Sequence, residues 1–100
     1  MNLIFEWDAK KARENVKKHK VSFEEAKTVF NDPYLLTFHE VPHSVNEDRF
    51  ISIGTSFRLR ILLVVHTEIN EMSDTVIIRI ISCRKATELE RKTYEQDLRQ

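Results

Sequence analysis

The first segment of the chain carries apolar residues at helical spacing. Ala9, Ala12 and Val16 recur every three or four positions, opposite a row of lysines, which is the pattern of an amphipathic helix. Asp8 stands where an N-cap side chain accepts a hydrogen bond from the first turn. These features predict a helix from Asp8 to about His19.

A second helix is expected directly afterwards. Ser22 and Glu25 have the spacing of a capping box, in which each side chain satisfies a backbone amide of the other residue. Apolar residues follow at helical spacing as far as Phe30. The segment Asn31–Pro33 ends the pattern, because the residue before a proline avoids helical backbone angles.

The middle of the chain changes to short runs of β-branched and aromatic residues, separated by polar segments that resemble turns. The connections are too short for crossover helices, so we expect an antiparallel meander. The four predicted strands are 34–40, 49–55, 59–69 and 75–84. Leu3–Phe5 is a candidate for a short leading strand.

A third helix is predicted at the end of the chain. Thr87 and Glu90 form a second capping box, and residues 86–98 are rich in good helix formers. The fold class is therefore α+β, with two N-terminal helices, a four-stranded antiparallel sheet and a C-terminal helix. One glycine and two prolines leave no linker, so residues 1–100 form a single predicted domain.

Charge is balanced overall but unevenly distributed. Sixteen basic and sixteen acidic residues give a formal net charge of zero, which excludes a uniformly basic nucleic-acid-binding surface. Residues 8–20 carry a net charge of +4, and residues 31–56 carry −3. A local basic patch is therefore still expected.

Several classes of protein are excluded by what the sequence lacks. Cys83 is the single cysteine, so neither an intramolecular disulfide nor a cysteine-based zinc cluster can form. The longest aliphatic run, 61–65, is too short to cross a bilayer. The N-terminus has no basic region and does not resemble a signal peptide. We expect a cytoplasmic protein without a cofactor.

One motif suggests a metal but lacks the required context. His39 and His43 match the zinc motif H-E-x-x-H, which brings both histidines to one metal only on a helix. Pro42 interrupts such a helix. No metal site is therefore predicted, and a loop role for His43 with Glu47 and Arg49 is favoured.

Side-chain alternation predicts where the polar chemistry lies, if the strands contain no bulge. In the third strand, one face (Leu59, Ile61, Leu63 and Val65) is apolar and is expected to be the core. The other face of that strand and one face of the fourth carry charged residues. Together they would collect Arg58, Arg60, His66, Glu68 and Arg79 on one side of the sheet, extended by Lys85.

These residue types suit cleavage of RNA without a metal. Histidine transfers protons near neutral pH, and arginine or lysine stabilises charge that develops on phosphorus. An alternative interpretation is that these side chains simply form structural pairs on a half-buried sheet.

Several stretches together resemble the BrnT family of type II toxins, over nearly the whole chain. The most specific block is Arg-Ile-Ile-Ser-x-Arg-Lys-Ala-Thr. The matching stretches are Phe5–Asp8, Val21–Ala26, Val64–Glu68 and Arg79–Thr87.

This resemblance implies a bacterial ribonuclease toxin with a RelE-like α+β fold that blocks translation. It implies neutralisation by a BrnA antitoxin, a ribbon-helix-helix protein through which the complex would contact operator DNA. The expected catalytic residues are His66 as general acid or base, Glu68 as its partner, and Arg79 and Lys85 as phosphate-stabilising cations. The expected RNA contacts are Arg58, Arg60 and Arg84.

Two features depart from the family pattern. Ile69 stands where an arginine commonly follows the His-Thr-Glu motif, and the balanced charge differs from that of basic RNA-cleaving toxins. The departure at Ile69 motivates an alternative hypothesis, in which the chain is a catalytically weak or inactive module that binds an antitoxin and tunes operon repression.

Overall fold

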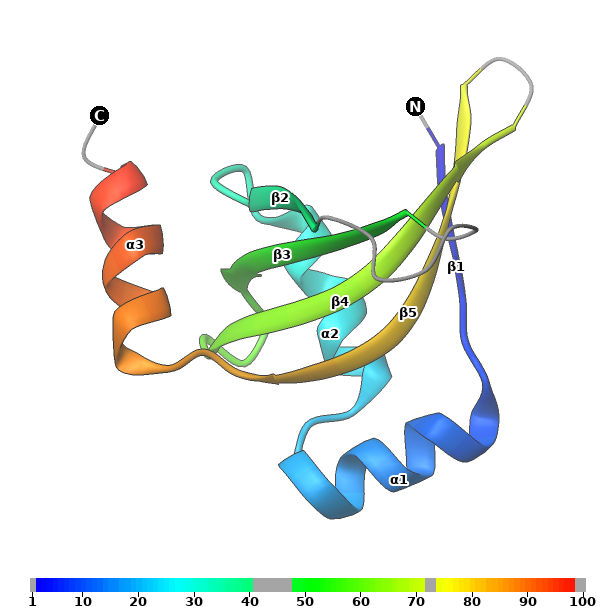
Figure 1. The fold of residues 1–100 in the computed structure, drawn as a ribbon, viewed down its shortest axis with the longest axis horizontal. Helices are drawn as coiled ribbons and strands as arrows, with labels where there is room; N and C mark the ends of the chain where they lie inside the picture. The colour runs from blue at the N-terminus through cyan, green and yellow to red at the C-terminus, as the bar shows by residue number, and fades with distance from the viewer. Residues whose placement is uncertain (1, 41–47, 72–73, 99–100) are drawn as a thin grey trace.

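The computed structural model describes residues 2–40, 48–71 and 74–98. Its elements, in chain order, are β1 (Asn2–Glu6), α1 (Ala9–His19), α2 (Phe23–Lys27), the 3₁₀ helix η1 (Thr28–Asn31), β2 (Leu36–Glu40), β3 (Arg49–Thr55), β4 (Ile61–Asn70), β5 (Thr75–Lys85) and α3 (Glu88–Leu98). Figure 1 shows α3 standing beside the sheet and α1 below it. The predicted α+β class is confirmed.

The five strands form one mixed sheet in the order β1-β5-β4-β3-β2. Strands β2 to β5 are the expected antiparallel meander. The prediction of a wholly antiparallel four-stranded sheet is wrong, because β1 pairs in parallel with β5 at the edge. This fifth strand contains the candidate Leu3–Phe5 segment and extends it by one residue at each end. The resulting mixed sheet differs from the RelE-like arrangement that the resemblance implied.

The predicted helix caps are largely confirmed. The Asp8 carboxylate accepts a hydrogen bond from the Lys11 amide at 3.0 Å, and the Ser22 hydroxyl accepts one from the Glu25 amide at 3.0 Å. At α3, the capping box with Thr87 has both of its hydrogen bonds. The second helix differs in two respects. Its capping box is only half formed, because the Glu25 carboxylate bonds to Ser56 and Arg60, and the helix tightens to a 3₁₀ turn after Lys27.

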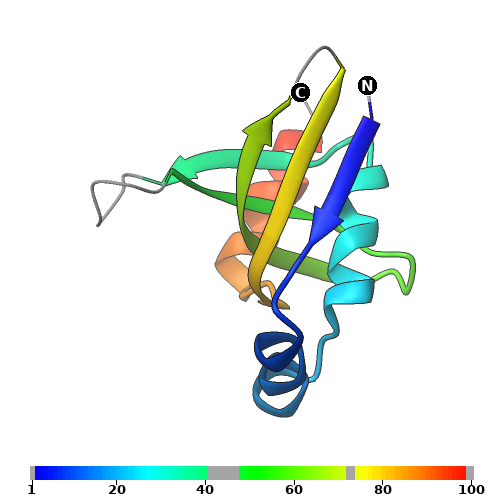
Figure 2. The same ribbon diagram turned by 90° about the vertical axis from the view of Figure 1, so that its right-hand side faces the viewer.

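Helices cover both faces of the sheet, but unequally. Figure 2 shows α2 and α3 on opposite sides of it. The main core lies on the α1–α2 side, between those helices and the strands. Its buried members are Val21, Phe23, Ala26, Val29, Leu62, Val64, Ile78, Ile80 and Cys83. A smaller cluster of Ile53, Leu63 and Tyr94 lies under α3.

Tyr94 anchors α3 to the rest of the domain. Its side chain is 3% exposed, and its hydroxyl donates a short hydrogen bond to Asp32 and lies 3.1 Å from the Thr55 hydroxyl. Asp32 also accepts from the Thr55 amide at 2.8 Å. Burial alone would raise the pKa of Asp32, but these hydrogen bonds outweigh it and lower the pKa.

The expected assignment of core and polar faces in β4 is only partly right. Leu63 is buried in the smaller cluster under α3, with Ile61 and Val65 packed against it, but the face expected to be polar forms the main core. Leu62 and Val64 are completely buried and belong to the main core. Leu59 does not belong to the strand at all; it lies in the turn before it and is 84% exposed. The face expected to carry the chemistry is therefore the face that packs against α2.

A β-bulge separates residues that strand alternation had placed together. Val65 pairs with Ser82, whereas His66 pairs with Ile80, so Ile81 has no partner on β4. One extra residue in a strand inverts the alternation beyond it. Arg79 therefore lies opposite Thr67 and points to the other face from His66.

No helix in the described parts of the chain is long and apolar enough to cross a membrane.

Candidate functional site

His66 is a core residue in this structure. Its side chain is completely buried, and its Nε2 atom is hydrogen-bonded to the Ser52 hydroxyl at 2.7 Å. Phe30 packs edge-on against the imidazole at 5.0 Å between centroids, and Phe50 stacks on it at 5.8 Å. Burial lowers the pKa of His66 to about 4, so the ring is neutral at physiological pH.

Glu68 shares the face of His66, as expected, but does not form a close pair with it. The Glu68 Oε1 atom is 3.8 Å from His66 Nδ1, too far for a hydrogen bond, and Nδ1 has no hydrogen-bond partner in the described structure. Burial also raises the pKa of Glu68. Because His66 is enclosed, it cannot contact a bound RNA in this conformation.

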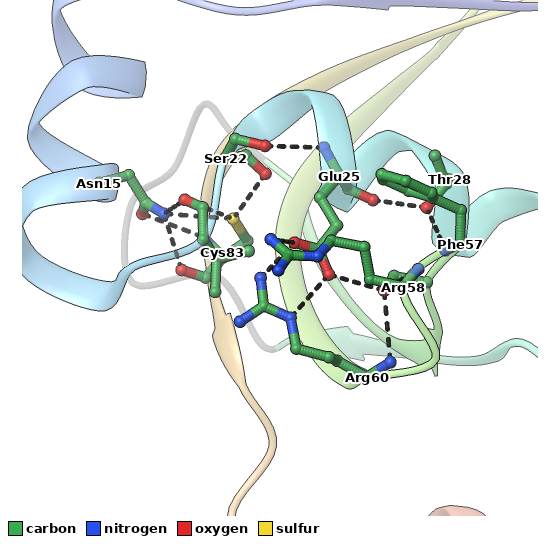
Figure 3. Close-up of polar contacts among 10 residues, drawn as sticks. Asn15, Ser22, Glu25, Thr28, Phe57, Arg58, Arg60 and Cys83 are labelled. Carbon is green, nitrogen blue, oxygen red and sulfur yellow. Dashed lines mark hydrogen bonds and ion pairs between the residues drawn. The ribbon is translucent and has the colours of Figure 1, made fainter.

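Arg60 is held by a buried carboxylate (Figure 3). Its Nε atom donates to Glu25 Oε2 at 2.9 Å, and its Nη2 atom makes a second short contact with Oε1. The Ser56 hydroxyl donates to the same carboxylate at 2.7 Å. The hydrogen bond from Arg60 is the main cause that lowers the pKa of Glu25. Arg58 lies 3.9 Å from Glu25 and is 60% exposed.

Arg84 is also engaged within the fold. Its guanidinium donates two hydrogen bonds to Glu90 on α3, at 2.8 and 3.0 Å. This fork lowers the pKa of Glu90 to about 2. Since Arg84 is opposite Leu63 on β4, the pair fastens α3 to its side of the sheet.

The prediction that the charged residues share one face is therefore wrong. His66, Glu68 and Lys85 have the parity of the α2 side, whereas Arg79 and Arg84 have that of the α3 side. Arg58 and Arg60 precede β4, in the turn from β3.

The face on the α3 side carries a different set of polar groups. Glu6 of β1 is opposite Arg79 of β5, which is opposite Thr67 of β4. On the far side, Glu40 of β2 is opposite Arg49 of β3. Since the neighbour of Arg49, Phe50, pairs with His66, Arg49 points to the same face as Thr67. We call these five residues the charged row.

Within this row, two arginines flank a nearly buried hydroxyl. Thr67 is 9% exposed, whereas Arg49 and Arg79 are both exposed. Arg79 donates a hydrogen bond to Glu6 at 2.7 Å, and its side chain is 45% exposed. Arg49 begins a predicted strand, but the sequence favoured a loop role for it beside His43. It was therefore not expected to be part of a site on the sheet.

Apolar rows border the charged row on both sides. Towards the tip of the sheet, Ile4, Ile77 and Ile69 are opposite one another, and Ile69 is 56% exposed. Towards α3, Phe38 lies opposite Ile51 and is 45% exposed. Cations at the centre of an exposed apolar sheet can bind phosphate while the surrounding side chains contact bases.

Other sequence candidates do not form sites. Cys83 is 1% exposed, and burial raises its pKa to about 12, so it is no nucleophile at neutral pH. Asn15 holds it through hydrogen bonds to its backbone and sulfur atoms (Figure 3). His39 lies 3.6 Å from Asp48.

Nothing in the described structure supports a metal site. Residues 2–40, 48–71 and 74–98 contain no group of three or more histidine, cysteine or acidic side chains arranged to hold a metal ion. The predicted loop role for His43 and Glu47 lies outside the described residues.

Comparison with known proteins identifies the family. A family model described as "Ribonuclease toxin, BrnT, of type II toxin-antitoxin system" matches residues 7–90. The crystal structure of the Brucella abortus ribonuclease toxin BrnT superposes with a TM-score of 0.60 and 22% sequence identity, covering 88% of this chain and 100% of that chain. This likeness supports a shared fold. The search among curated proteins found no match. Since the family model spans most of the sequence, the chain belongs to the BrnT family of ribonuclease toxins of type II toxin–antitoxin systems.

Proposed function

We propose that this chain is a metal-independent endoribonuclease that cleaves RNA on the charged row and thereby inhibits translation. The observation that carries the proposal is the placement of Arg49 and Arg79 on either side of Thr67, on the exposed face of the sheet. Of the catalytic residues expected from the sequence, the proposal retains Arg79. It replaces the buried His66 with the Glu6 carboxylate of the charged row.

The chemistry follows from these groups. The Glu6 carboxylate, 2.7 Å from Arg79, accepts the proton of a ribose 2′-hydroxyl as general base. The 2′-oxygen attacks the adjacent phosphorus, and the 5′-oxygen leaves and takes a proton from solvent. The products are a 2′,3′-cyclic phosphate and a 5′-hydroxyl. Arg49 and Arg79 stabilise the additional negative charge on the phosphoryl oxygens.

Cleavage of a long RNA in the presence of EDTA tests this proposal. Arg49→Gln and Arg79→Gln should each slow cleavage by about 100-fold, the cost typical of losing one oxyanion-stabilising group. Arg13→Gln is the matched control. Arg13 is exposed on α1, so this substitution removes the same charge from the other side of the molecule. Full cleavage by both charged-row variants, or a requirement for added metal, would refute the proposal. If purified RNA is not cut, the same variants are compared on translating ribosomes.

The proposed partner is a BrnA-type ribbon-helix-helix antitoxin. Membership of a type II toxin–antitoxin family supports a protein antitoxin. The exposed apolar rows beside the charged row offer it a surface that would also block RNA. In this proposal the complex contacts operator DNA through the antitoxin, and the toxin acts in the cytoplasm, where ribosomes translate.

A second candidate function is an antitoxin-binding module with little catalytic activity. Two observations favour it: Ile69 is exposed beside the charged row, and the described part of that face presents no histidine. Growth arrest on expression of the chain, relieved by Arg79→Gln, would support the ribonuclease. Antitoxin binding without growth arrest would support the module.

A further inference from the structure

A second group of cations lies around the junction between β5 and α3. Figure 1 shows this junction at the end of the sheet. The cations surround a cleft of about 340 Å³. The cleft is lined by Leu59, Arg60, Ile61, Lys85, Ala86 and Arg91. Lys85 is six residues beyond Arg79 on β5, roughly 20 Å along an extended strand. The cleft is therefore distinct from the charged row.

Two of these cations are not neutralised within the fold. Lys85 and Arg91 are exposed, and neither forms an ion pair among the described residues. Glu88, which lies near Arg91 on α3, is 3.6 Å from Lys92 instead. The cleft thus presents two positive charges from two different elements, and neither is in an ion pair among the described residues, although Glu88 and Glu95 lie beside Arg91 on α3.

The third cation has a different role. Arg60 is fixed by its hydrogen bonds to the buried Glu25 carboxylate, so it forms a rigid wall of the cleft. Its own charge is largely offset by Glu25. The mobile charges available to a ligand are therefore those of Lys85 and Arg91.

Leu59 contributes an exposed apolar side chain to the cleft. It is 84% exposed and has a φ of 63°, a left-handed conformation that is costly for a non-glycine residue. The turn that holds it there is closed by hydrogen bonds between Ser56 and Arg60 and between Leu59 and Ser56. A large apolar side chain is thus held in water beside two cations.

We propose that this cleft binds a phosphate group of single-stranded RNA, a few nucleotides away from the bond that is cut. Lys85 and Arg91 contact the phosphate oxygens, and Leu59 packs against the adjoining base. Single-strand binding sites combine a positively charged groove for the backbone with side chains, most often aromatic, that pack against the bases; here Leu59 would supply that contact. The inference rests on the proposed ribonuclease function and assigns Lys85 to substrate binding rather than catalysis.

The test measures binding to a fluorescent 12-nucleotide RNA with 2′-O-methyl groups throughout, which cannot be cleaved by attack of the 2′-oxygen. The double variant Lys85→Gln, Arg91→Gln should raise Kd about tenfold near 0.15 M salt and reduce the slope of log Kd against log salt by about 1.4. The matched control, Lys17→Gln with Arg13→Gln on α1, removes two exposed charges elsewhere and should leave both quantities near those of the wild type.

Leu59→Gly provides the second variant. Glycine adopts a positive φ freely, which offsets its greater loss of backbone entropy on folding, so a purely structural role predicts a melting temperature close to that of the wild type and unchanged RNA binding. The proposal predicts weaker RNA binding at that same melting temperature.

The outcomes separate this inference from the ribonuclease proposal. Cleavage of natural RNA, with an unchanged salt slope in the Lys85–Arg91 variant, would overturn the cleft and leave the ribonuclease intact. Cleft-dependent binding of the methylated RNA, without cleavage of natural RNA on or off ribosomes, would support the cleft and remove the ribonuclease. Loss of binding to an acidic polypeptide such as polyglutamate, with RNA binding unaffected, would assign the cleft to a protein partner and overturn the inference.

Discussion

Titration of His66 distinguishes a core histidine from a catalytic one. The pKa of His66 is lowered from 6.5 to about 4 by burial, so the unfolded chain binds a proton between these values and the folded chain does not. Stability contributed by the neutral ring is therefore fully present above pH 6.5 and falls as the pH decreases. The loss approaches about 3 kcal/mol near pH 4, because each pKa unit corresponds to about 1.4 kcal/mol.

The assay is urea unfolding of the wild type and His66→Gln between pH 4 and 7. Glutamine does not titrate, and its terminal amide can still bond to the Ser52 hydroxyl that now contacts His66 Nε2. As the pH falls from 7 to 4, the unfolding free energy of the wild type should decrease by about 3 kcal/mol relative to that of His66→Gln. Contributions of Glu68 and the other carboxylates largely cancel in that difference.

A difference independent of pH would refute this reasoning. It would mean that the folded protein protonates His66 near its ordinary pKa, as a ring with access to solvent or to Glu68 would. A His66→Gln protein that remains folded at 15 °C but no longer cleaves RNA would also contradict the structural role and return His66 to the active site.

The remaining predictions concern stability and are checked by urea unfolding at pH 7. Arg60→Ala should lower the unfolding free energy by about 3 kcal/mol, because it leaves the Glu25 carboxylate, whose side chain is 3% exposed, without its main partner. Arg58 lies 3.9 Å from Glu25 and is 60% exposed, so the matched control Arg58→Ala should lower it by less than about 1 kcal/mol. Equal costs would contradict the different roles assigned to the two arginines. Gly54→Ala should cost about 2 kcal/mol, because the added Cβ would lie 3.1 Å from Val29 Cβ; an unchanged midpoint would show that this contact relaxes freely.

Local patterns in the sequence predicted most of the secondary structure. The caps at Asp8, Ser22 and Thr87 depend on side chains and amides three residues apart, so short spacing is sufficient to recognise them. The antiparallel meander was equally accessible, since short polar connections leave adjacent strands few other ways to pair. The family resemblance was also a property of the sequence, and the family model confirms it.

The arrangement of the candidate site depended on contacts that the local pattern does not encode. Alternation predicts a face only while the strand is regular, and the bulge at Ile81 places Arg79 on the face opposite His66. The parallel pairing of β1 with β5 joins segments about 70 residues apart. No short-range signal specifies that partner.

Burial was the other property decided by the tertiary structure. His66 and Arg79 are both polar residues in strands, and alternation alone does not predict which of them is buried. Helix α2 and the 3₁₀ turn cover one face, which encloses His66 beside Phe30, while the charged row on the other face stays exposed. The sequence by itself determined the elements, their caps and the family. The tertiary structure decided which side chains meet, because facing and burial arise from how distant elements pack together.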